Sequence, residues 1–68
     1  MSDHVYKSIE VTGSSTESIQ DAVRVAVAKA AESVHNLEWF EVTEIRGHIA
    51  DQQLAHFQVT TKLGFRLE

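Results

Sequence analysis

Three segments of the chain alternate apolar and polar residues with the two-residue period of a β-strand. Residues 4–12, "HVYKSIEVT", predict a first strand. Residues 38–46 predict a second strand, and residues 54–67 predict a third and longer one. Between the last two lies the mostly polar sequence "GHIADQQ", residues 47–53, which predicts a connecting loop.

The segment from about residue 16 to residue 35 has instead the 3.6-residue period of an amphipathic helix. Ser14 or Ser15 is expected to cap its start, and Ser14 has capping-box spacing to Glu17. Asn36 is expected to cap its end. The apolar stripe predicts packing against a sheet rather than a ligand site, and it consists of Ile19, Val23, Ala26, Ala30 and Val34.

The element order β-α-β-β predicts a single α+β domain over residues 1–68. One helix must cover one face of a three-stranded, mostly antiparallel sheet, which gives two layers. The last strand would be about 46 Å long at about 3.3 Å per residue, whereas a compact chain of this size is about 30 Å across. It must therefore curl around the helix or extend into a neighbouring subunit, and both outcomes favour an oligomer.

Trp39 and Phe40 are adjacent, so in a strand they point to opposite faces of the sheet. One candidate core set is Phe40 with Val42, and the other is Trp39 with Ile45. The second set also includes Glu41, which would be a poor core neighbour. We therefore expect Phe40 and Val42 to enter the core and Trp39 to lie on the face away from the helix.

The outward face is then polar, with Trp39 and Gln58 on it. One interpretation is an ordinary subunit interface, because a Trp packs well there and its indole N–H finds an acceptor. The other is a ligand site, since an indole offers a stacking platform and Gln offers a donor beside an acceptor, which suits a planar heteroaromatic ring with an amide-like edge. Both interpretations can hold together if the site forms between subunits. Arg46 would anchor a phosphate if one lies nearby.

Composition and charge argue against several classes of partner. The net charge of −4 disfavours nucleic acids and anionic membranes. No apolar run approaches the roughly 20 residues that span a bilayer, and no signal peptide is visible, so we expect a cytoplasmic protein. The chain has no Cys, and its four His lack ligand spacing, so we expect no disulfide and no metal site. Glu41 and Glu44 are expected on opposite faces of their strand, and no catalytic set stands out.

With these elements in place, the sequence resembles the dodecin family. The segments "YKSIEVTGSSTESIQDAV", "LEWFEVTEIRGHI" and "HFQVTTKLGFRLE" are similar to its signature blocks and extend the resemblance over residues 4–68. The resemblance implies a small flavin-binding protein that assembles into a hollow homododecamer, with paired flavins on twofold axes. It implies that the rings stack between two copies of Trp39, that Gln58 hydrogen-bonds the ring edge, and that Arg46 lies near the phosphate. The resemblance implies that an arginine there favours FMN over flavins without a phosphate, and it leaves riboflavin and FAD open as alternatives.

The resemblance also implies flavin storage and photoprotection rather than turnover, so we expect no enzyme. Some bacterial members bind coenzyme A, for which Arg66 is a candidate contact. The archaeal branch has an acidic residue where this chain has His48, so no metal site is assigned there. Two alternatives stay open. One is an assembly module in which Trp39 only anchors an interface, and the other is a flavoenzyme, although the sequence offers no visible acid, base or nicotinamide site.

Overall fold

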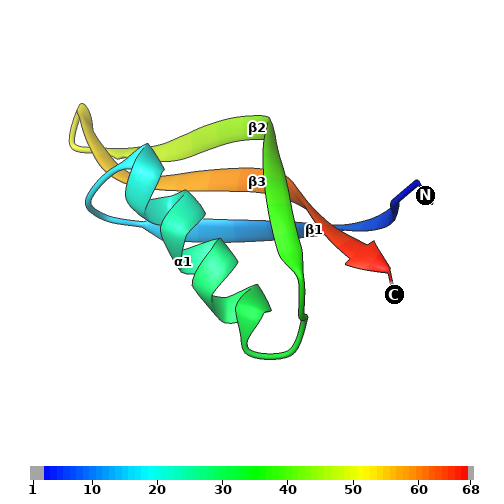
Figure 1. The fold of residues 1–68 in the computed structure, drawn as a ribbon. Helices are drawn as coiled ribbons and strands as arrows, with labels where there is room; N and C mark the ends of the chain where they lie inside the picture. Colours follow the sequence, from blue (N-terminus) through cyan, green and yellow to red (C-terminus); the bar gives the residue numbers. More distant parts are fainter. Residues whose placement is uncertain (1–2, 68) are drawn as a thin grey trace.

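A computed structural model of the chain, which describes residues 3–67, contains one helix packed on a three-stranded sheet (Figure 1). The strands are β1 (Val5–Ser15), β2 (Leu37–Ala50) and β3 (Gln53–Leu67), and the helix α1 (Ile19–Ala31) connects β1 to β2. The sheet order is β1-β3-β2, and the central strand β3 pairs antiparallel with both neighbours. The predicted β-α-β-β order and two-layer α+β architecture are confirmed.

The strands are longer, and the last connection shorter, than the alternation predicted. β1 continues to Ser15, and the expected loop at residues 47–53 is a tight turn at Asp51 and Gln52. These two residues have φ values of 53° and 64°, the left-handed geometry of a two-residue hairpin turn. The loop prediction was wrong because polar side chains also occupy strands that face solvent on both sides.

The helix begins after Ser18, and the expected cap at Ser14 or Ser15 is wrong. Ser18 is the N-cap, and its Oγ accepts a hydrogen bond from the amide of Asp21 at 2.9 Å. The buried Ser15 hydroxyl accepts from the amide of Glu17 at 2.9 Å and donates to the Asp21 carboxylate at 2.7 Å. Because β1 extends to Ser15, the helix begins later in the chain than predicted. Ser15 therefore stabilises the turn before the helix and is not itself the N-cap.

The helix also ends earlier than its apolar period predicted. Its C-cap is Glu32, and Asn36, the expected cap, lies at the entry to β2 with a φ of 65°. Asn tolerates this left-handed conformation better than most residues. The carbonyl of Asn36 accepts a hydrogen bond from the amide of Arg66 at 3.2 Å. Asn36 therefore redirects the chain into the sheet rather than closing the helix.

The core lies where α1 crosses β1 and β3, and small residues bring the two layers close together. A Cβ on Gly13 of β1 would overlap the carbonyl of Ala22 and lie 2.9 Å from the Cβ of Ala26. The helix therefore rests directly on the β1 backbone. The buried side chains of this region are Ala22, Ala26 and Ala30 from the helix and Val59, Thr61 and Leu63 from β3.

The helix packs on β1 and β3 but leaves β2 largely uncovered. Phe40 lies on the helix side of the sheet, as predicted, because it pairs with Leu63. Its side chain is nevertheless 58% exposed, and Val42 and Ile45 of the same side are 38% and 54% exposed. The expectation that Phe40 and Val42 enter the core of a single chain is therefore wrong. An exposed apolar row of this kind is typical of a surface that associates.

The chain is elongated, with a longest extent of 56 Å. Figure 1 shows a sharp bend in the middle of β2 and a β2–β3 hairpin that projects beyond the helix.

Residues 1–2 and 68, the ends of the expected domain, lie outside the described residues. Within residues 3–67, α1 is too short and too polar to cross a membrane, and no group of three or more acidic, His or Cys side chains could hold a metal ion.

Replacing Gly13 with valine is expected to destabilise the fold by about 1–3 kcal/mol, because its side chain would collide with the α1 backbone. Urea and thermal denaturation at equal protein concentration would measure the change. The control Glu10→Ala, at an exposed position of the same strand, should change the free energy of unfolding by less than about 0.5 kcal/mol. An unchanged unfolding midpoint for Gly13→Val would contradict the close helix–sheet approach.

Candidate functional site

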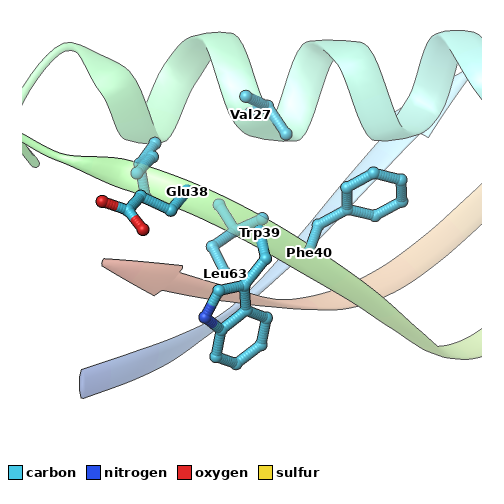
Figure 2. Close-up of a pocket in the computed structure, with 6 residues that line it drawn as sticks. Val27, Glu38, Trp39, Phe40 and Leu63 are labelled. Carbon is cyan, nitrogen blue, oxygen red and sulfur yellow. The ribbon is translucent and has the colours of Figure 1, made fainter. Parts of the chain in front are cut away.

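The register of β2 against β3 places Trp39 on the side of the sheet away from α1. Trp39 pairs with Gly64, whereas Phe40 pairs with Leu63 on the helix side. In Figure 2 the indole points away from the helix, with Val27 of α1 on the opposite side of β2. The predicted outward orientation of Trp39 is confirmed. We call this side the outer face, and its β2 residues are Trp39, Glu41, Glu44, Arg46 and His48, together with their β3 partners.

A glycine makes room for the indole. A Cβ on Gly64 would overlap the ring atoms Cε2, Cζ2 and Nε1 of Trp39, so the indole lies directly over the Gly64 backbone. Trp39 is still 41% exposed. The sheet therefore supports one side of the ring, while the other side is open to a second flat group.

A β-bulge at Thr43 changes the facing of the residues that follow it in β2. The Thr43 hydroxyl donates to a β3 carbonyl at 3.2 Å. Strict alternation predicted Ile45 beside Trp39, and Glu41 and Glu44 on opposite faces. Both predictions are wrong, because the register shift moves Ile45 to the helix side and brings Glu44 onto the outer face with Glu41.

Arg46 and Gln58 are direct cross-strand partners on the outer face. The Arg46 guanidinium lies 2.9 Å from Oε2 of Glu44, and both side chains are at least half exposed. Gln58 is exposed as well. An open pocket of about 360 Å³ beside them is lined by Ser14, Ser15, Thr16, His56 and Gln58. A cation next to an amide suits a phosphate or the polar edge of a ring.

Trp39 and Gln58 share the outer face but not the same place on it. Trp39 lies over position 64 of β3, and position 58 is about 20 Å away along the strand at about 3.3 Å per residue. That distance exceeds the length of a three-ring heterocycle. A site that uses both side chains on one ring therefore needs two copies of the chain.

A smaller open cavity lies on the helix side of β2, behind Trp39. It measures about 180 Å³, below the roughly 300–1,000 Å³ of most small-molecule sites. Figure 2 shows its lining, which is mostly apolar: Val27, Leu37, Glu38, Trp39, Phe40 and Leu63. This cavity is therefore separate from the open side of the indole on the outer face.

A polar cluster beside Trp39 was not predicted from the sequence. Oε1 of Glu38 accepts a hydrogen bond from the Tyr6 hydroxyl at 3.0 Å, and Oε2 lies 3.8 Å from Nε of Arg66. The hydrogen bond to Glu38 raises the pKa of Tyr6, as do desolvation and the Glu38 charge, while Arg66 acts against them. The three residues come from three strands, so only the register brings them together.

The small β-α-β-β fold carries a half-exposed indole on its outer face, and both features can be compared with those of known proteins. The Dodecin family model matches residues 5–68. A curated dodecin from Thermus thermophilus is 44% identical over 64 residues, which cover 94% of this chain and 93% of that protein. The chain therefore belongs to the dodecin family and is, in general terms, a flavin-binding protein.

Solved structures agree with this assignment. The structure of dodecin from Streptomyces coelicolor is 53% identical with a TM-score of 0.91, and the match covers 100% of this chain and 97% of that one. A dodecin from Streptomyces davaonensis is 46% identical with a TM-score of 0.90 over 98% of both chains. The resemblance inferred from the sequence is confirmed.

Gly64→Ala is expected to displace the indole, because the added methyl group occupies the position of the ring. Trp39 is the only Trp of the chain, so its emission spectrum and near-UV circular dichroism report the change directly. We expect a red-shifted emission and a loss of about 1–3 kcal/mol of stability. Ser8→Ala, at the β1 partner of Gly64, is the control and should leave both spectra unchanged. Identical spectra for the two variants would argue against the contact.

Proposed function

We propose that this protein binds FMN and stores it protected from light, as a homododecamer that holds pairs of flavins between subunits. The observation that carries the proposal is the indole of Trp39, lying over Gly64 on the outer face and open on its other side. In this proposal residues 1–68 act as one binding domain in the cytoplasm, with no nucleic-acid or membrane partner and no substrate turnover.

Trp39 fits a flavin because it offers one free aromatic surface of the right kind. A base stacked on an aromatic side chain gains about 1–3 kcal/mol, and the isoalloxazine ring is comparably flat and heteroaromatic. Since the sheet covers the other side of the indole, each Trp39 can stack on only one ring. A twofold axis in front of Trp39 would bring a second indole opposite the first, with room for two rings between them.

Gln58 and Arg46 supply the polar contacts in this proposal. The Gln58 amide can donate to a ring carbonyl and accept from the ring N–H, and Arg46 can hold the phosphate in bidentate fashion. The separation from Trp39 implies that these residues serve a ring stacked on another copy's indole. A phosphate near Arg46 would exchange with Glu44, its present partner. This arrangement favours FMN over riboflavin, which has no phosphate.

The uncovered side of β2 supports assembly. Phe40, Val42 and Ile45 are each more than one-third exposed on the helix side of the sheet. A chain of this length buries only about 60% of the surface exposed by its unfolded form, so it gains much from association. Burial of this row between subunits would leave the outer face, with Trp39, for the ligand.

Trp39 would also account for photoprotection. When bound, the flavin supplies the ring that absorbs light. In van der Waals contact, the electron-rich indole can donate an electron to the excited ring and take it back, so the energy is lost as heat. No other group of the outer face is required to move a proton, which agrees with storage rather than turnover. Coenzyme A remains a further proposed ligand, with Arg66 as its candidate contact.

Trp39→Ala is expected to weaken FMN binding by about tenfold to a hundredfold, because it removes the stacking surface. Equilibrium dialysis of FMN against protein measures this affinity directly, because loss of the indole removes the fluorescence quenching whether or not the flavin binds. Trp39→Phe retains a smaller aromatic surface and should bind with intermediate affinity.

Sedimentation of the same variants separates storage from the alternative, in which Trp39 only anchors an assembly interface. Storage predicts an intact oligomer for Trp39→Ala. A broken oligomer, together with purified wild-type protein that neither is yellow nor quenches FMN, would favour the assembly module.

Arg46→Ala is expected to weaken FMN binding by about tenfold to a hundredfold and to change riboflavin binding by less than about twofold. The reason is that only FMN offers a phosphate to the guanidinium. Parallel titrations of both flavins measure the difference, and Glu41→Ala, which removes a charge elsewhere on the outer face, is the matched control. Equal losses for the two flavins would exclude a phosphate contact at Arg46.

A further inference from the structure

The carboxylate of Glu38 joins all three strands immediately beside Trp39. Glu38 lies on β2, Tyr6 on β1 and Arg66 on β3, and Tyr6 and Arg66 are themselves cross-strand partners. The Tyr6 hydroxyl donates to one carboxylate oxygen at 3.0 Å, and Nε of Arg66 lies 3.8 Å from the other. The longer Arg66 contact is partly exposed, so the hydrogen bond from Tyr6 is the better-defined of the two.

Glu38 occupies one of the positions where the ladder between β2 and β3 is interrupted. The register shifts between Leu37 and Trp39, so Glu38 is the extra residue of a bulge and has no β3 partner of its own. β2 is also an edge strand, paired only with β3. Rotation of the backbone at Glu38 would turn the next residue, Trp39, away from its place over Gly64. A side-chain contact across the sheet adds a restraint at this bulge beyond the backbone pairs on either side of it.

We propose that Tyr6 is a positioning residue for the flavin site: by holding Glu38 at the bulge, it keeps the Trp39 indole flat over Gly64 and ready to stack. This inference rests on the proposed function of Trp39 in flavin binding. Tyr6 need not touch the ligand.

The charges around Tyr6 give the contact a defined pH dependence. Glu38 faces it from β2, Arg66 from β3, and the His4 ring from the residue just before β1, at a centroid distance of 6.4 Å. The hydrogen bond to Glu38 is the main reason that the pKa of Tyr6 lies above its ordinary 10.0. The neutral hydroxyl that donates is therefore fully present below pH 10.0 and is lost as the pH rises through the raised value. Above it, a phenolate would face a carboxylate, and the bulge would lose its support.

Tyr6→Phe tests the inference, because it removes the donor and keeps the ring. At neutral pH we expect FMN to bind about threefold to tenfold more weakly, with the oligomer intact by sedimentation. At alkaline pH the wild-type protein should lose FMN affinity in step with tyrosinate absorbance, which Tyr6 alone produces because it is the only Tyr. Tyr6→Phe should lack that step. The flavin N–H also ionises at alkaline pH, but equally for both proteins, so the difference between them is the readout.

Glu38→Gln is the second variant, since its amide oxygen still accepts from the Tyr6 hydroxyl while the charge is removed. We expect the tyrosinate transition and the loss of FMN affinity to move together to lower pH. Equal FMN affinities of wild type and Tyr6→Phe at both neutral and alkaline pH would overturn the inference and leave the proposed function intact. A lower melting temperature with unchanged affinity would do the same, because it would make Tyr6 a stabilising residue only. Failure of the wild-type protein to bind FMN would overturn both.

Discussion

The pairing of β2 with β3, interrupted by bulges, is the constraint on which the outer face depends. The first bulge sets Trp39 opposite Gly64, and the second brings Arg46 opposite Gln58. Because side chains alternate with a period of two, each extra residue reverses the facing of all that follow. Without the bulge at Thr43, Arg46 would face the helix side and could not share a surface with Gln58.

The helix is the second constraint, because it is too small to cover the whole of one face of the sheet. Alanines on α1 and Gly13 on β1 allow a close approach, but over β1 and β3 only. The apolar side of β2 is left exposed, while Trp39 and Gln58 lie far apart along the outer face. In the proposed function, assembly and ligand binding would use opposite faces of the same strand.

Much of this could be predicted from the sequence, because the signals are local. The alternation of residues 4–12 and 54–67 predicted two strands correctly, and the alanine-rich stripe predicted a helix that packs closely on a sheet. The adjacency of Trp39 and Phe40 predicted opposite facings. The cap at Ser18 was missed because β1 extends further than its alternation indicates. Ser14 and Ser15 therefore lie in the strand, although the sequence had made them the candidate N-caps.

The sequence by itself determined the element order, the outward Trp39 and the family, since each depends on local periodicity or on short motifs. The tertiary structure alone decided that Arg46 lies beside Gln58, that Phe40 stays exposed, and that Tyr6 and Arg66 meet at Glu38. These facts depend on where β2 slips by one residue against β3, on the pairing of β1 with β3, and on how far the helix reaches across the sheet. Neither quantity is encoded in the pattern of any single segment.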